Sequence, residues 1–191
     1  MKEEIRERFT EATNVIHLAG EHLTERIAKA VDTIVSACRA GGAVYLFGNG
    51  GSAADAQHIA CELVGRFLTE RPALRAQALT TDSSVLTAVA NDYDFEKVFA
   101  RQLEAYGRPG DVAIGLSTSG NSPNVVAGLA TARRIGMRTI AFTGAGGGRC
   151  AELADVLLDV PCSQPCPRIQ EAHAVTYHVL CEFVERALTQ K

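Results

Sequence analysis

The chain has 191 residues, 47% of them hydrophobic and 21% charged, with a net charge of −3 at pH 7. These values suit one globular domain and argue against a nucleic-acid or membrane surface. No segment approaches the ~18 apolar residues of a membrane span, and the charged N-terminus lacks the apolar core of a signal peptide, so we expect a cytoplasmic protein with reduced cysteines.

Residues 2–40 are predicted to form a pair of helices. Apolar residues recur there at spacings of three and four, from Ile5 and Phe9 to Ile27 and Ile34, while charged residues occupy the other positions. The glycines at 41 and 42 are expected to end the second helix.

From residue 43 onward, strand patterns alternate with helix patterns. The strands are expected at 43–48, 75–79, 111–117, 138–144 and 154–161. The helices are expected from the first glycine turn to about residue 68, and at 84–92, 95–107, 125–136 and 169–189. This alternation is typical of a parallel sheet with helices on both faces. We predict a single α/β domain over 1–191: a five-stranded parallel sheet in a flavodoxin-like three-layer sandwich (43–191), preceded by the helical pair (1–40).

The glycine turn GNGGSA (48–53) follows the first strand and matches the dinucleotide pattern G-x-G-x-x-[GA]. A dinucleotide site needs an acidic residue ~20 positions further on, at the end of the next strand. Here that residue is Asp82, more than thirty positions after Gly48. The turn also lacks the lysine of a nucleoside-triphosphate loop. It therefore indicates a phosphate site of another kind.

His58 and Glu62 follow on the next helix, four residues apart. This spacing places both on one helix face, ~6 Å apart along the axis, which suits two ligands of one divalent metal or a base and its orienting partner. The ordinary alternative is that Glu62 pairs with Arg66 and that His58 lies over Asp55. The two residues alone leave both readings open.

The loop STSGNSPN (117–124) follows the third strand and carries the hydroxyls of Ser117, Thr118, Ser119 and Ser122. Ser122 suits the N-cap of the next helix and Pro123 its first turn. Hydroxyls and free backbone N–H groups at a helix N-terminus bind phosphate well, and capping alone requires fewer hydroxyls. Because both loops leave the carboxyl ends of strands, we expect them on the same edge of the sheet.

Two cysteines, Cys162 and Cys166, precede the closing helix in DVPCSQPCPR. A single C-x-x-x-C is weak evidence for a metal site or a disulfide, so their role stays open.

The closing helix places Gln170, His173 and His178 among apolar residues, where polar side chains need partners. Gln170 and His178 are eight residues apart, ~12 Å along a straight helix. For both to bind one metal, Gln170 must lie at a distorted helix start or the two must come from different subunits. We favour an inter-subunit site.

Four segments, in order, carry a family resemblance: GNGGSAADAQHIACEL, ALTTDSSVLTAVANDYDFEKVFARQL, STSGNSPNV and RIQEAHAVTYHVLCEFVE. Together they resemble the phosphoheptose isomerases of the SIS-domain (sugar isomerase) superfamily over nearly the whole chain. The resemblance implies a homotetramer with sites at subunit interfaces. It also implies conversion of D-sedoheptulose 7-phosphate to D-glycero-D-manno-heptose 7-phosphate by enediol-type proton transfer. That reaction begins nucleotide-activated heptose synthesis for surface polysaccharides such as lipopolysaccharide.

The resemblance also assigns residues. It implies one zinc ion per subunit, held by His58, Glu62, Gln170 and His178, and we assign Glu62 as the carbon base and His178 as the acid–base group at oxygen. The implied substrate contacts are Asn49, Gly50, Gly51, Ser52, Glu62, Asn91, Asp92, Gln170 and, at the phosphate, Ser117, Thr118, Ser119 and Ser122. Two alternatives remain: an isomerase for another phosphosugar, and a non-enzymatic SIS-domain scaffold that binds the replication initiator protein.

Overall fold

A five-stranded parallel sheet forms the centre of the computed structural model, which describes residues 1–163 and 165–190. Its strand order is β2-β1-β3-β4-β5. The strands are β1 (Val44–Gly48), β2 (Ala76–Ala78), β3 (Val112–Ser117), β4 (Arg138–Thr143) and β5 (Val156–Asp159). The paired strands β1 and β3, in register from Val44 opposite Val112, are buried throughout, as expected for parallel strands covered on both faces.

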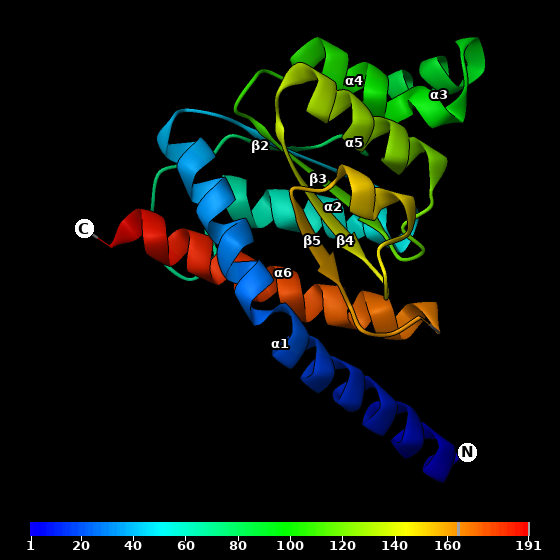
Figure 1. Ribbon diagram of the computed structural model, residues 1–191. Helices are drawn as coiled ribbons and strands as arrows, with labels where there is room; N and C mark the ends of the chain where they lie inside the picture. The colour runs from blue at the N-terminus through cyan, green and yellow to red at the C-terminus, as the bar shows by residue number, and fades with distance from the viewer. Residues whose placement is uncertain (164, 191) are drawn as a thin grey trace.

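Helices cover both faces of the sheet (Figure 1). One face carries α1 (Lys2–Arg39), α2 (Gly51–Val64) and α6 (Cys166–Thr189); the other carries α3 (Ser83–Asp92), α4 (Val98–Tyr106) and α5 (Pro123–Ile135). Successive side chains of a strand point to opposite faces, so Val44 and Leu46 of β1 pack under α1, α2 and α6, while Tyr45 and Phe47 pack under α4 and α5. The predicted three-layer α/β architecture is confirmed.

The predicted N-terminal pair of helices is wrong, because residues 2–39 form one continuous helix, α1, of 38 residues. Gly20 lies near its middle, and one glycine costs a helix only about 1 kcal/mol relative to alanine. The second half of α1 buries Leu23 and Ile34, which offsets that cost. The first half projects away from the domain (Figure 1) and exposes Ile5 and Phe9.

Other element boundaries differ from prediction by a few residues. Helix α2 ends at Val64 rather than near residue 68, and the Glu185 carboxylate of α6 accepts hydrogen bonds from the backbone of the turn after it. The segment predicted as one helix from residue 95 begins with a 3-10 turn (Phe95–Lys97), because the Asp94 side chain accepts a hydrogen bond from the backbone N–H of Glu96. A second 3-10 turn spans Gly148–Leu153. No helix among the described residues is long and apolar enough to cross a membrane.

Candidate functional site

The glycine loop and the serine loop lie side by side at the carboxyl edge of the sheet, as predicted, because β1 and β3 are neighbouring strands. The side chains of Asn49 and Asn124 exchange two hydrogen bonds of 2.8 Å, which join the loops directly. Gly50 has φ +56°, a left-handed conformation that favours glycine. Ser52 is buried in the first turn of α2. The two loops therefore form one connected polar region at this edge of the sheet.

Three serine hydroxyls form a cluster at the start of α5. Ser117 Oγ lies 2.9 Å from Ser122 Oγ and 3.5 Å from Ser119 Oγ. Ser122 is the N-cap residue and Pro123 begins the helix, as predicted, but the Ser122 hydroxyl bonds to Ser117 instead of capping a helix N–H. The hydroxyls thus gather at the positive end of the α5 dipole, an arrangement that suits an anion.

A third loop, between β4 and β5, supports the serine loop from behind. Gly120 has φ +65°, and a Cβ atom there would overlap the carbonyl oxygen of Gly147. The Asn121 side chain donates to the Ser119 carbonyl (2.8 Å) and accepts from the Arg149 backbone N–H (3.1 Å). The sequence analysis did not find this support, although the run GAGGG at 144–148 was a visible signal of a close backbone approach.

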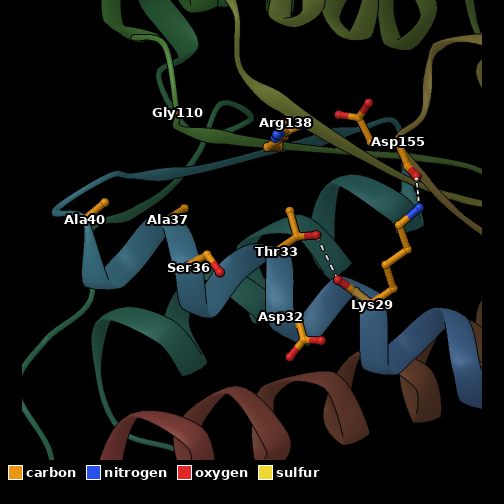
Figure 2. Close-up of a pocket in the computed structure, with 9 residues that line it drawn as sticks. All are labelled: Lys29, Asp32, Thr33, Ser36, Ala37, Ala40, Gly110, Arg138 and Asp155. Atoms are coloured by element: carbon orange, nitrogen blue, oxygen red, sulfur yellow. Dashed lines mark hydrogen bonds between the residues drawn. The ribbon is translucent and has the colours of Figure 1, made fainter.

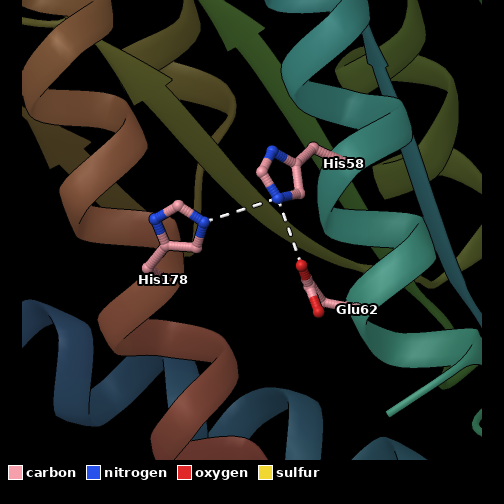
Figure 3. Close-up of side chains that lie close together, drawn as sticks. All are labelled: His58, Glu62 and His178. Atoms are coloured by element: carbon pink, nitrogen blue, oxygen red, sulfur yellow. Dashed lines mark hydrogen bonds and ion pairs between the residues drawn. The ribbon is translucent and has the colours of Figure 1, made fainter. Parts of the chain in front are cut away.

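His58 and Glu62 of α2 meet His178 of α6 (Figure 3), and these three residues are called the triad below. One ligand atom from each lies within 4.8 Å of the others. Nε2 of His58 is 3.1 Å from Oε1 of Glu62 and 3.4 Å from Nε2 of His178. Two imidazoles and a carboxylate are a donor set that fits zinc, with a fourth position open.

The alternative pairing of Glu62 with Arg66 is absent from the described residues, because Glu62 faces His58 and Arg66 lies 4.0 Å from Glu70 instead. The His58 side chain is 44% exposed and that of Glu62 is 18% exposed. The triad is therefore open to solvent or to a partner.

Two aromatic side chains that the sequence analysis missed pack behind the triad. The ring of Phe67 stacks on His178, with centroids 5.9 Å apart, and the Tyr177 hydroxyl lies 3.1 Å from Nδ1 of His58. Tyr177 precedes His178 in the sequence, but only the packing of α6 on α2 shows that it contacts His58.

Gln170 does not join the triad of its own chain. Helix α6 is regular from Cys166 onward, which excludes a distorted start at Gln170. Its side chain lies against the glycine loop, because a Cβ atom at Gly51 would be 2.5 Å from Nε2 of Gln170. His178 is eight residues further along the same helix, ~12 Å away along its axis. Within one chain, Gln170 therefore belongs with the glycine loop.

The other predicted positions are placed as follows. Asn91 and Asp92, at the end of α3, are exposed, and the Asn91 amide donates to the Asp92 carboxylate at 2.8 Å. Thr118 Oγ1 accepts a hydrogen bond from the Cys166 thiol at 3.3 Å. No disulfide forms among the cysteines of the described residues.

His173 is fully buried, its Nε2 donates to the Thr143 carbonyl at 3.0 Å, and burial lowers its pKa to about 4.

A hollow of about 620 Å³ lies at the other end of the sheet (Figure 2). Its lining includes Lys29 of α1, Arg138 at the start of β4 and Asp155 just before β5. Lys29 donates to the Asp155 carbonyl at 3.0 Å, and charges of both signs line the hollow. It borders the amino ends of the strands, so it is separate from the loops at the carboxyl edge.

The chain is similar to known proteins over most of its length. Residues 8–144 match the family model of the SIS domain. A phosphoheptose isomerase of Desulfovibrio desulfuricans is 60% identical over 152 residues, 79% of this chain and 72% of that protein. The phosphoheptose isomerase of Aquifex aeolicus is 51% identical over the full length of both chains. The solved structure of the Neisseria gonorrhoeae phosphoheptose isomerase superposes with a TM-score of 0.91 at 41% identity, covering 97% of this chain and 98% of that one.

Proposed function

Because this chain belongs to the phosphoheptose isomerase family of SIS-domain proteins, we propose that it converts D-sedoheptulose 7-phosphate to D-glycero-D-manno-heptose 7-phosphate. The observation that carries the proposal is the triad, two members of which lie on α2, the helix that leaves the glycine loop. His58 follows Gly51 by seven residues, so the acid–base groups lie roughly 10 Å along α2 from the anion-binding loops. The arrangement suits a substrate with a phosphate at one end and reacting carbons at the other.

The serine loop is proposed to hold the phosphate. The cluster of Ser117, Ser119 and Ser122 offers hydroxyl donors at the N-terminus of α5, and Thr118 adds a fourth. The glycine loop, with Asn49 anchored on Asn124, would bind the sugar hydroxyls beside it. Asn91 and Asp92 are proposed as further sugar contacts on the family resemblance. Binding energy from the remote phosphate can then position the reacting carbons.

The triad is proposed to move the protons. Aldose–ketose isomerisation transfers a proton between adjacent carbons through an enediol or enediolate, which needs a base at carbon and an acid–base group at oxygen. We assign Glu62 as the carbon base and His178 as the group that shuttles protons between the two oxygens. Both project from helices of the rigid core, so their separation is set by the packing of α2 on α6.

A metal fits the same residues. We propose zinc, with His58, Glu62 and His178 as ligands from one chain and Gln170 from a second chain. When bound, the ion would polarise the carbonyl and neighbouring hydroxyl as a Lewis acid. A tightly coordinated carboxylate is a weaker base, so we propose that Glu62 is held loosely in the working complex.

We propose a homotetramer with sites at subunit interfaces. The projecting half of α1 exposes Ile5 (51%) and Phe9 (73%), and α6 exposes Phe183 (45%), apolar surface that a second copy would cover. Gln170 cannot reach the triad of its own chain along a continuous α6, so a shared site requires a second chain. Co-expressing Gln170→Ala and His178→Ala subunits tests this. Activity in the mixture that neither variant shows alone supports shared sites; no recovery in mixed tetramers contradicts them.

The reaction itself is tested by incubating the purified protein with sedoheptulose 7-phosphate and following the products by NMR, before and after metal chelation. Conversion that chelation removes and zinc restores supports both the reaction and the metal. Conversion that is unchanged by chelation supports the reaction but contradicts a role for the metal in it. No conversion by a folded oligomer would favour another phosphosugar, and then the scaffold alternative. The proposed cellular setting is the cytoplasm, with the product entering activated-heptose synthesis for surface polysaccharides such as lipopolysaccharide.

A further inference from the structure

His58 uses both nitrogens of its ring. Nε2 faces the other two members of the triad, and Nδ1 faces the hydroxyl of Tyr177 at 3.1 Å. Tyr177 is 3% exposed, so water is excluded from most of its surface. The inner nitrogen of His58 therefore has a fixed protein partner, while the outer one stays available.

Asp55 lies one helical turn before His58 on α2, and its side chain interacts with that of Tyr177. Its Oδ2 atom is buried and has no hydrogen bond from the described residues. A tyrosine hydroxyl is protonated at neutral pH and can both donate and accept a hydrogen bond. A protonated hydroxyl between a carboxylate and an imidazole can donate to one and accept from the other.

We propose that Asp55 and Tyr177 form a hydrogen-bonded relay that orients His58 as a metal ligand. Tyr177 donates to Asp55 and accepts the Nδ1–H of His58, which leaves the Nε2 lone pair directed at the centre of the triad. Histidines that bind metals usually donate their second N–H to a carboxylate or carbonyl, and that partner fixes the tautomer and the ring orientation. Here a tyrosine lies between the imidazole and the carboxylate. The inference rests on the metal site of the proposed function.

The relay can be separated from the packing role of the same side chain. The Tyr177 ring makes edge contacts with both histidines, at centroid distances of 5.2 Å to His58 and 4.8 Å to His178. Phenylalanine at position 177 keeps the ring and its contacts but removes the hydroxyl. Nδ1 of His58 then loses its partner, while the volume of the core is unchanged.

The experiment measures zinc affinity by competition with a chromophoric chelator for the wild type, Tyr177→Phe and Tyr45→Phe. Tyr45 is the matched control, because its buried ring also directs a hydroxyl to a protein acceptor, the Tyr106 carbonyl at 3.1 Å, on the other face of the sheet. We expect Tyr177→Phe to weaken zinc binding by about 10- to 100-fold and Tyr45→Phe to leave it unchanged. Asp55→Asn keeps an acceptor but removes the charge, so we expect a smaller loss in the same direction.

Each outcome decides a different point. Equal zinc affinity in Tyr177→Phe and the wild type would overturn the relay while leaving the metal site intact. Equal losses in Tyr177→Phe and Tyr45→Phe would also overturn it, because the effect would then be general. A wild type that binds no zinc would remove both the metal site and the relay, whereas the isomerase assay would still test the reaction by itself. NMR of the zinc-loaded protein adds a second readout: a protected Nδ1–H resonance of His58 is expected in the wild type and lost in Tyr177→Phe.

Discussion

The carboxylate of Glu185 lies 3.5 Å from Nε of Arg71, and both side chains are almost fully buried, at 4% and 3% exposure. Glu185 also accepts hydrogen bonds of 2.8 Å from the backbone N–H groups of residues 67–69. Arg71 donates to the carbonyls of Glu62 and Leu63 at the end of α2. One buried ion pair therefore holds the turn after α2, and with it the ring that stacks on His178.

Replacing Glu185 by glutamine is expected to destabilise the fold by about 3–5 kcal/mol, because the Arg71 charge is left buried without its partner. Urea unfolding at pH 7 measures the change. Glu104→Gln is the control, since the exposed pair of Glu104 with Arg134 at 2.8 Å should contribute only about 0–1 kcal/mol. Equal, small effects of the two substitutions would show that the buried pair is not a stabilising clamp.

The same carboxylate predicts a pH dependence of stability. Burial alone would raise the pKa of Glu185, but the three backbone hydrogen bonds outweigh it and hold the pKa below its ordinary value. A depressed pKa in the folded state stabilises the protein above the unfolded pKa, and this contribution is lost as the pH falls through the folded value. Between pH 6 and 3, the free energy of unfolding should therefore fall more steeply with decreasing pH in the wild type than in Glu185→Gln. The same pH dependence in both proteins would contradict the view that the low pKa of Glu185 stabilises the fold.

Buried His173 predicts a second loss of stability on acidification, which begins at a higher pH than the loss due to Glu185. Burial lowers its pKa from 6.5 to about 4, so below pH 6.5 the unfolded chain takes up a proton that the native state excludes. The stabilisation is complete above the unfolded pKa and declines as the pH falls toward 4, by about 2 kcal/mol between pH 7 and 5. His173→Gln, which keeps a donor for the Thr143 carbonyl, should lack this decline in urea unfolding. The interpretation fails if the variant and the wild type lose stability equally over that range.

Gly120→Ala is expected to disrupt anion binding at the serine loop. The new Cβ atom would collide with the carbonyl of Gly147, in addition to the cost of φ +65°. Gly146→Ala is the matched control, because Gly146 has φ +81° but open space around the Cβ position. Both variants bear the left-handed strain of about 1–2 kcal/mol, so only the collision differs. Calorimetric titration with inorganic phosphate should show at least tenfold weaker binding for Gly120→Ala alone; equal affinities in both variants would disprove the role of this contact.

Glu62→Gln and His178→Gln are each expected to lower kcat by at least about 100-fold, since each removes one proton-transfer group. Light scattering and circular dichroism should show an unchanged, folded oligomer. Glu70→Gln, which alters an 87% exposed carboxylate in the turn after α2, should retain wild-type turnover. Near-normal turnover in either triad variant would remove that residue from the proposed mechanism.

The sequence alone determined the parts of this protein that local patterns encode. Short strand patterns that alternate with helix patterns predicted the parallel sheet. The residue types of the loops at 48–53 and 117–124 indicated the edge of the sheet where the site lies. The spacing of His58 and Glu62 placed them on one helix face. Each of these signals spans only a few residues, so it can be recognised without knowing which other segments pack against it.

The tertiary structure decided what depends on contacts between distant segments. The break predicted between two helices within residues 2–40 does not form, because burial of the second half of α1 outweighs the local cost of Gly20. The partner of Glu62 is His58 rather than Arg66, and α6 brings His178 to the same point. The pairing of Arg71 with Glu185 and the position of Tyr177 behind His58 join α2 and its following turn to α6. Such contacts depend on how two helices pack on the sheet, and no short stretch of sequence carries that information.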